Sequence, residues 1–406
     1  MSHSTCNHTA KRLVAVLGSL IVSGALAACS GSSTPSVVQA LGTHVGGPPA
    51  ATYKIIYTFK GGSDGSAPKA QLVDVNGTLF GTTFTGGTTF DGTVYSMNTG
   101  GAEKVLYTFG SKAKDGEAPL GGLIDVNGAL FGATSESTNA PTNCGAVYKV
   151  TTAGAESVKY LFKNSPDGCR PIGQLVKLNT EMYGTTSLGG DSRGDGVIFQ
   201  VTTGGTEKVD YTFTGDPDGS QPSAGLTNVS GTFYGTTTAG GTDNLGAIFS
   251  FSAVGGEHIV HSFGSGSDGV LPFGGLLDVN GTLYGTTELG GTHSAGTVFS
   301  FTPSTGTEKV VYNFGASSTD AATPSGNLVA LNGVLYGTTQ SGGTNSDGTI
   351  YSVTKAGREA VLHSFPSMSG DGGAPLAGLV NVSGTLVGTA SVGGAGSQGM
   401  AYTLVP

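Results

Sequence analysis

A glycine-centred phrase, Leu79-Phe80-Gly81-Thr82-Thr83, constrains the fold of this 406-residue chain more than any other feature, because it returns six more times. The recurring glycines are Gly81, Gly132, Gly184, Gly235, Gly285, Gly337 and Gly388. Successive copies lie 51, 52, 51, 50, 52 and 51 residues apart. A period of this length, held over seven copies, indicates a repeat architecture in which each copy packs on its neighbours.

Each copy of the repeat predicts four short strands. In the fifth copy, two apolar stretches flank Asn280-Gly281, a dipeptide that suits the two-residue type I′ turn of a hairpin. A glycine-rich loop then leads to a third strand at 297–301, and a second turn leads to a fourth strand at 308–314. Four-stranded antiparallel units repeated around an axis form propeller blades. The sequence therefore predicts an all-β, seven-bladed β-propeller.

The two ends of the repeat region are complementary, which predicts that the ring is closed. Residues 53–59 form a lone fourth strand, whereas the last copy ends with its third strand at 399–406. The N-terminal strand can therefore complete the last blade. No linker interrupts the repeats, so we expect residues 53–406 to form one domain.

The N-terminal segment predicts export and lipid anchoring. Lys11 and Arg12 precede an apolar run that is short for a membrane span and has the layout of a signal peptide. The run ends at Leu26-Ala27-Ala28-Cys29, which resembles the lipobox of bacterial lipoproteins. We expect a signal peptide over 1–28 and a flexible tether over 29–52 that follows a lipidated Cys29. The chain would then be held in the cell envelope, at the outer membrane or cell surface, through lipid alone. The alternative is an ordinary secretory signal that ends near a cysteine.

The charge balance argues against nucleic acid as a partner. The chain has 27 Asp and Glu residues against 18 Lys and Arg residues. Signal removal would take away two bases and no acid, which leaves 16 bases and a formal charge of −11. Binding to phosphate backbones needs a basic surface, which such a chain lacks.

Two cysteines remain once Cys6 is removed with the signal and Cys29 is lipidated. In a four-stranded meander, the loop between strands b and c and the loop from strand d to the next blade lie on one face. Cys144 ends the b–c loop of the second copy, and Cys169 lies in the next d–a loop, so both reach this loop face. An even cysteine pair in an exported protein predicts a disulfide. Two free buried thiols are the alternative.

The phrase 280–287, Asn-Gly-Thr-Leu-Tyr-Gly-Thr-Thr, with Gly290-Gly291-Thr292 after it, resembles the GloVer, or choice-of-anchor, tandem-repeat family of bacterial surface proteins. The resemblance covers about residues 53–406. The layout of the blades is also kelch-like, by analogy only, since tryptophan is absent. The family resemblance implies surface display through varied anchors and supplies no catalytic residues, which agrees with an anchor at Cys29.

An Asp-Gly-x-x-Pro motif recurs in the d–a loops. Its aspartates are Asp64, Asp115, Asp167, Asp218, Asp268 and Asp371, with Asp320-Ala321 in the sixth copy. Carboxylates are ligands for calcium, so a ring of seven could bind that ion. The sequence favours a structural role instead: Asp caps the turn, Gly takes an unusual φ and Pro starts the next segment.

Departures from the repeat mark the candidate ligand-binding residues. Asp191, Arg193 and Asp195 gather in the b–c loop of the third copy, and His293 lies in that of the fifth. No cluster dictates a reaction or a cofactor. The sequence thus favours a monomeric, non-catalytic module that binds an extracellular polysaccharide or protein. The alternatives are a glycan hydrolase or lyase that uses these four residues near the axial mouth, and a passive envelope scaffold.

Overall fold

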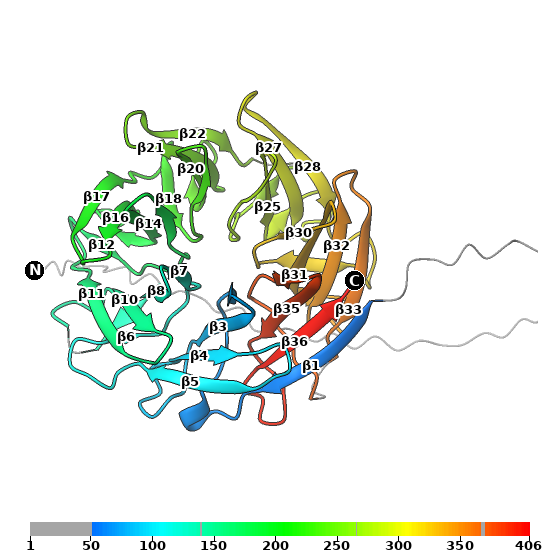
Figure 1. The fold of residues 1–406 in the computed structure, drawn as a ribbon. Coiled ribbons are helices and arrows are strands. Elements are labelled where there is room, and N and C mark those ends of the chain that lie inside the picture. Colours follow the sequence, from blue (N-terminus) through cyan, green and yellow to red (C-terminus); the bar gives the residue numbers. More distant parts are fainter. Residues whose placement is uncertain (1–50, 139, 265, 367–369) are drawn as a thin grey trace, which may run out of the picture. The chain divides into compact units, whose positions relative to one another are not determined.

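The computed structural model describes residues 51–406, apart from 139, 265 and 367–369. The predicted signal peptide, Cys29 and most of the predicted tether lie outside these residues. The described part of the chain forms seven main antiparallel sheets that follow one another around an axis (Figure 1). The predicted seven-bladed β-propeller is therefore confirmed.

Each blade contains strands a, b, c and d in order from the axis outwards. In blades 1 to 4 these are β2 (Val73–Val75), β3 (Thr78–Thr83), β4 (Thr93–Met97), β5 (Glu103–Thr108); β7 (Ile124–Val126), β8 (Ala129–Thr134), β10 (Ala146–Thr151), β11 (Glu156–Leu161); β13 (Val176–Leu178), β14 (Glu181–Thr186), β16 (Val197–Thr202), β17 (Glu207–Thr212); and β19 (Thr227–Val229), β20 (Thr232–Gly240), β21 (Ala247–Ser252), β22 (Gly256–Ser262). In blades 5 to 7 they are β24 (Leu277–Val279), β25 (Thr282–Thr287), β27 (Thr297–Thr302), β28 (Thr307–Asn313); β30 (Val329–Leu331), β31 (Val334–Gly342), β32 (Thr349–Thr354), β33 (Glu359–Ser364); and β34 (Val380–Val382), β35 (Thr385–Ala390), β36 (Met400–Val405), β1 (Thr52–Thr58).

The ring closes as predicted, through β1. This strand pairs antiparallel with β36, with Thr52 opposite Val405 and Thr58 opposite Met400. Figure 1 shows the first and last strands of the described chain side by side in blade 7. The N-terminal strand therefore supplies strand d of the last blade, and every blade has its four strands.

The a–b hairpins have the expected turn geometry. Asn280 and Gly281 have φ angles of 56° and 81°, and both central residues of a type I′ turn need positive φ. The Asp278 carboxylate accepts a hydrogen bond from the Gly281 backbone N–H at 2.8 Å. Local sequence thus specifies these turns without help from neighbouring blades.

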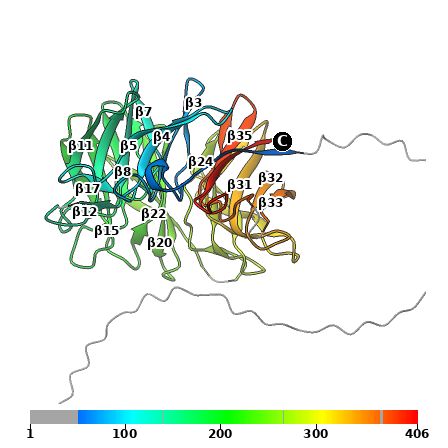
Figure 2. The same ribbon diagram turned by 90° about the horizontal axis from the view of Figure 1, so that it is seen from below.

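Short additional strands join the loops on the loop face. Three pairs link a d–a loop to the b–c loop of the blade it enters: β6 (Gly116–Glu117) with β9 (Glu136–Ser137), β12 (Gly168–Cys169) with β15 (Leu188–Gly189), and β23 (Gly269–Val270) with β26 (Leu289–Gly290). In blades 4 and 6, β18 (Gly219–Pro222) and β29 (Ala321–Pro324) pair with the long strands β20 and β31. Figure 2 shows the blades from the side. The loop face is therefore held by hydrogen bonds.

The only helical element among the described residues is a 3₁₀ turn, η1 (Gly62–Asp64). Within that part of the chain, no helix has the length and apolar character needed to cross a membrane.

Aromatic contacts between neighbouring blades form the core. A phenylalanine follows strand d of every blade and is at most 1% exposed; these residues are Phe59, Phe109, Phe162, Phe213, Phe263, Phe314 and Phe365. Each ring packs edge-on against an aromatic ring in strand c of the next blade, with centroids 4.9 to 5.5 Å apart. Such pairs stabilise a fold beyond the apolar area that they bury. Within the core, these seven contacts therefore link every blade to the next.

Phe263→Ala tests one of these contacts. We expect it to lower the free energy of unfolding by about 3–5 kcal/mol, because it leaves a cavity against Phe299, 5.2 Å away between ring centroids. Urea denaturation followed by circular dichroism measures the change. Phe90→Ala is the control, since Phe90 is 71% exposed. Equal losses from both variants would contradict a core that depends on contacts between blades.

Candidate functional site

A repeated hydrogen bond joins neighbouring blades on the loop face. The residue before the proline of each d–a loop has a positive φ and donates its backbone N–H to the b–c loop of the preceding blade. Gln221 donates in this way to the Asp195 carbonyl at 2.9 Å, and Ala67 donates to Gln398 at 2.8 Å across the ring closure. The other donors are Ala118, Arg170, Leu271, Thr323 and Ala374. Backbone atoms thus fix the loop face in every blade.

The prediction for the glycine of the Asp-Gly-x-x-Pro motif is wrong in blades 2 to 5. There the unusual φ belongs to the residue before proline, and the glycine has none. Glycine is needed because strand b approaches closely: a Cβ on Gly269 would lie 2.2 Å from the Thr287 Oγ1 atom. Only in the loops that enter blades 1 and 7 do the motif glycines, Gly65 and Gly372, have positive φ.

The motif aspartates have the structural role that the sequence favoured. Asp218 accepts hydrogen bonds from the backbone N–H groups of Thr214 and Gly219, at 2.8 and 2.7 Å, and from the Tyr211 hydroxyl at 2.9 Å. A tyrosine from strand d donates to the motif aspartate in the same way at five blade interfaces; these residues are Tyr57, Tyr107, Tyr160, Tyr211 and Tyr312. The carboxylates therefore cap their own loops.

Sequence reasoning missed a third member of this cluster, a glutamate that begins strand d of the next blade. At the interface of blades 3 and 4, burial and the nearby charge of Asp218 raise the pKa of Glu257 to about 7. Burial likewise raises the pKa of Glu103, Glu207 and Glu359 to about 7, with the charge of the motif aspartate adding to it. The glutamate recurs with the repeat period, which is the signal that could have found it.

The predicted disulfide is present. Cys144 and Cys169 are bonded, with their Cα atoms 4.4 Å apart, and both side chains are buried. The bond joins the b–c loop of blade 2 to the d–a loop that enters blade 3. Next to it, the Asn143 side chain accepts a hydrogen bond from the Ser137 backbone N–H at 2.7 Å, inside the long loop of blade 2.

The structure does not gather the four predicted ligand residues into one site. Asp191 accepts a hydrogen bond from the Arg193 backbone at 2.8 Å, and the Arg193 guanidinium donates to the Thr214 carbonyl. The Asp195 carboxylate accepts a hydrogen bond from the Ser220 hydroxyl at 2.5 Å. His293 is exposed in a loop two blades away, where its Nδ1 atom lies 3.0 Å from the Thr292 hydroxyl. Their role in binding stays a prediction.

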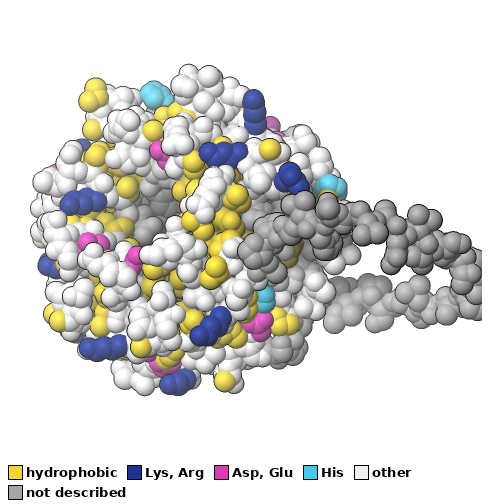
Figure 3. Space-filling model, turned by 45° about the vertical axis from the view of Figure 1, so that its right-hand side comes forward, with side chains coloured by type: hydrophobic (Ala, Val, Ile, Leu, Met, Phe, Trp, Pro, Cys, Tyr) yellow, Lys and Arg dark blue, Asp and Glu magenta, His cyan; other side chains and the backbone are white. Residues whose placement is uncertain are grey.

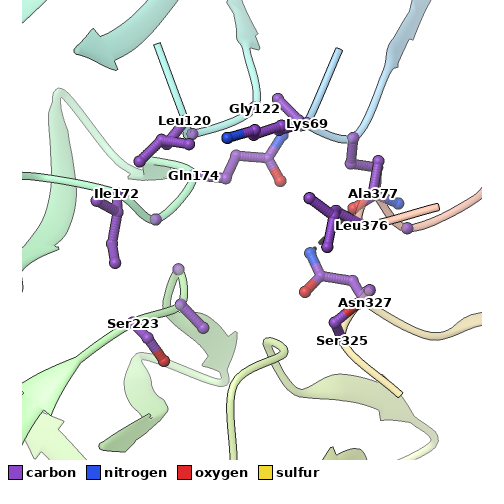
Figure 4. A pocket seen from close by; sticks show the side chains of 18 of the residues that line it. Lys69, Leu120, Gly122, Ile172, Gln174, Ser223, Ser325, Asn327, Leu376 and Ala377 are labelled. Carbon is purple, nitrogen blue, oxygen red and sulfur yellow. Dashed lines mark hydrogen bonds between the residues drawn. The ribbon is translucent and has the colours of Figure 1, made fainter. Parts of the chain in front are cut away.

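A pocket opens instead on the axis, where the d–a loops lead into the innermost strands. It has a volume of about 100 Å³. Figure 4 shows side chains from several blades around it, and Figure 3 shows hydrophobic side chains around the central hollow of the ring. The residue that follows the d–a loop proline in each blade lines this pocket: Lys69, Leu120, Ile172, Ser223, Phe273, Ser325 and Leu376. The site is therefore built by all seven repeats at a position where they differ.

Three amide side chains form the floor of this axial pocket. Gln71, Gln174 and Asn327 occupy a position that is glycine in the other four blades, and they also line a second cavity of about 420 Å³ along the innermost strands. The Asn327 amide donates to the Gln71 side-chain oxygen at 3.0 Å. Gln71 and Gln174 donate to the carbonyls of Leu379 and Leu123, each at 2.7 Å. The amides therefore lie between the axial pocket and this second cavity.

The axial pocket has a positive character. Of the residues that the structure describes around it, Lys69 alone is charged. The Lys69 ammonium lies 3.7 Å from the centroid of the Phe84 ring, and burial lowers the pKa of this amine. A half-buried ammonium without a carboxylate among the lining residues favours an anionic or strongly polar group in the pocket.

The buried glutamates at the blade interfaces predict an unusual pH dependence of stability. Their pKa is near 7 in the folded protein and near 4.5 when exposed, so the folded chain holds more protons between these pH values. Stability should therefore fall as pH rises from about 5 to 8. We expect a higher midpoint of thermal unfolding at pH 5.5 than at pH 8.

Glu257→Gln should raise the unfolding midpoint at pH 8 and reduce its pH dependence, because the variant cannot acquire the buried charge. Asp243→Asn is the control, since Asp243 is exposed in a b–c loop. A midpoint that rises with pH in the wild-type protein, over the same range, would contradict the role of these glutamates.

Comparisons with known proteins agree with the fold and the repeat. An oligogalacturonate lyase in complex with manganese is 14% identical over 88% of this chain and 91% of its own, with a TM-score of 0.54. PorZ, a surface component of the type-IX secretion system of Porphyromonas gingivalis, is 12% identical over 86% of this chain and 47% of its own, with a TM-score of 0.52. At such identities the likeness concerns the fold alone. No curated protein matches the sequence.

The model of one repeat family matches almost all of the propeller. It covers residues 31–216 and 188–402 and describes the Gloeobacter/Verrucomicrobia repeat. The resemblance seen in the repeat phrase is thereby confirmed. This chain belongs to the Gloeobacter/Verrucomicrobia repeat family.

Proposed function

We propose that this protein is an exported, lipid-anchored propeller that binds an extracellular polysaccharide or protein at its loop face, without catalysis, with the axial pocket at the centre. One observation carries the proposal. The residues that recur with the repeat hold blades together, whereas one position that differs strongly between repeats contributes a side chain from every blade to the mouth of the axial pocket.

The recurring residues are occupied by structural contacts. The motif aspartates accept hydrogen bonds from their own loops and from tyrosines, and the buried phenylalanines fill the spaces between blades. At the pocket mouth, by contrast, Lys69, Phe273 and Ser325 hold equivalent places. Selection for a stable ring does not require such different side chains at one repeat position, whereas recognition of an asymmetric ligand does.

The chemistry of the mouth suits a ligand. Apolar side chains with a few oriented polar groups are typical of binding pockets. Gln71 and Gln174 are held by backbone carbonyls and are therefore oriented before a ligand arrives. With Lys69 as the charged lining residue, an acidic sugar or a protein carboxylate fits the pocket best.

Two features support export. The lipobox-like sequence at Cys29 is typical of envelope lipoproteins. The disulfide between Cys144 and Cys169 is of a kind that persists in oxidising compartments outside the cytoplasm. A lipid on Cys29 would then leave the propeller free to meet ligands outside the membrane.

A glycan-active enzyme and a passive scaffold are the competing functions. One structural neighbour is an oligogalacturonate lyase, but this likeness concerns the fold alone. Asp191, Arg193, Asp195 and His293, the residues considered for catalysis, are not among those that line the axial pocket. We therefore favour binding.

The proposal predicts which surface substitutions weaken binding. The ligand is first identified by a binding screen against polysaccharides and envelope proteins. The screen uses the full chain, released from membranes with detergent. Lys69→Leu and Phe273→Ser introduce residues found at the equivalent place in other blades, so the fold should tolerate them. We expect each to weaken binding at least ~10-fold, because a single desolvated contact contributes about 1.4 kcal/mol or more.

Val254→Ser is the matched control. Val254 is fully exposed in a turn between strands c and d, away from the axial mouth. Affinity measured by surface plasmon resonance should not change in this variant. Equal loss from the turn and mouth variants would contradict recognition at the mouth, and turnover of a polysaccharide would favour the enzyme.

A further inference from the structure

Two of the seven blade interfaces depart from the tyrosine, aspartate and glutamate cluster. At the interface of blades 7 and 1, the Tyr57 hydroxyl donates to Asp64 at 2.6 Å and lies 3.1 Å from a Glu103 carboxylate oxygen. The tyrosine hydroxyl, which has a single hydrogen, thus lies between two neighbouring acids. Histidine replaces it at His261, between blades 4 and 5, and at His363, between blades 6 and 7.

The cluster between blades 4 and 5 brings three metal-ligating side chains together. His261 lies next to the last residue of β22, Asp268 lies in the loop that follows, and Glu308 is the second residue of β28. One ligand atom from each lies within 4.8 Å of the others, and all three residues are half-buried. His261 Nε2 lies 3.4 Å from Asp268 Oδ2.

His261 Nε2 and Glu308 Oε1 are buried from solvent and make no hydrogen bond of normal geometry within the described residues, although His261 Nε2 faces the Asp268 carboxylate. The equivalent glutamate oxygen is also unpaired at five other interfaces, so this cluster is distinguished by a histidine nitrogen beside two carboxylates. Asp268 Oδ2 accepts one bond, from the Gly264 backbone N–H at 3.0 Å, and so keeps a lone pair. Buried polar groups without partners are unfavourable, and a cation between the three side chains would satisfy them.

We propose that His261, Asp268 and Glu308 bind one divalent transition-metal ion, of which zinc is the test case. An imidazole nitrogen with two carboxylate oxygens is a ligand set that zinc accepts, and three protein ligands leave a position for water. Two carboxylates also supply the negative charge that a divalent ion neutralises. Calcium prefers six to eight oxygen ligands, so this set disfavours it.

The other histidine interface provides an internal comparison. His363 Nε2 lies 3.2 Å from Asp371 Oδ2, as in the proposed site. The place of the glutamate is taken by Tyr53, whose ring stacks on His363 with centroids 3.7 Å apart and an interplanar angle of 9°. The second carboxylate is therefore missing, and only the cluster at His261 has the three ligands.

The position of the site indicates what the ion would do. His261 and Glu308 belong to the outer strands of neighbouring blades, so one ion would link the two blades. Binding to the folded state alone stabilises it in proportion to the logarithm of ion concentration. This role is separate from ligand binding at the axial pocket.

Zinc titration of the full chain tests the site. The protein is purified without a polyhistidine tag, stripped with a chelator and titrated by calorimetry. We expect one zinc ion per chain. His261→Tyr introduces the residue of five other interfaces and should fold; its zinc affinity should fall by more than the ~10- to 100-fold that outer-shell substitutions cost. Glu308→Gln should behave alike.

His363→Tyr is the matched control and should bind zinc as the wild-type protein does. The midpoint of thermal unfolding should rise with zinc in the wild-type protein and in His363→Tyr, and stay constant in His261→Tyr. Zinc binding that survives His261→Tyr, or its absence from the stripped wild-type protein, would overturn the proposal. Calcium at the same concentration should not displace zinc.

Discussion

The contact between a buried phenylalanine at the end of one blade and an aromatic ring in the next is the interaction on which the rest of this structure depends. A four-stranded blade is too thin to bury both faces, so its stability comes from its neighbours. The phenylalanine also donates its backbone N–H to the preceding loop, as Phe263 does to Gly246 at 2.9 Å. The ring and the backbone N–H of the phenylalanine thus both help to fix the spacing between neighbouring blades. β1 carries Phe59 into the same arrangement, so ring closure uses the contact found at every other interface.

Around this core, the polar residues of the repeat hold the loops in place, mainly through hydrogen bonds. The motif aspartate, the tyrosine of strand d and the glutamate of the next blade meet at the circumference, while the residue before proline bonds to the preceding blade on the loop face. At five interfaces the aspartate and the tyrosine are hydrogen-bonded to each other, and the backbone groups are paired at all seven, so these groups are poor candidates for recognition. The side chains left to meet a ligand are those in which one repeat differs from the next.

Such differences are few, and each has a distinct chemical character. Cys144 and Cys169 form a disulfide between blades 2 and 3. Three amides line the axial pocket, and Lys69 places an ammonium at its mouth. At the circumference, His261 brings a ring nitrogen close to two carboxylates. A symmetric scaffold of this kind holds its backbone geometry constant while single substitutions introduce new chemistry. Fold alone therefore says little about ligands, and the asymmetric positions carry the functional argument.

The sequence by itself determined the number of blades, the four strands of each, the hairpin turns, the closure by β1 and the disulfide pair. These follow from a regular period, from Asn-Gly turns and from apolar alternation, all of which act locally along the chain. It also identified the structural role of the motif aspartates, but in blades 2 to 5 it assigned the unusual φ to the wrong residue. Close approach of strand b, which makes Gly269 necessary, is a property of packing and not of the motif.

Apart from the disulfide pair, only the tertiary structure decided which side chains meet across blades. Asn327 and Gln71 are 256 residues apart in the chain, yet they share a hydrogen bond on the axis, because the segments that lead into the innermost strands of all blades converge around it. Likewise, Glu308 lies far in sequence from His261, and the two meet because the outer strands of adjacent blades converge at the circumference. The repeat period reveals that the glutamate recurs, but it does not show which side chains it meets. Both the axial pocket and the His261 cluster therefore result from the closed ring, which brings residues of different blades together.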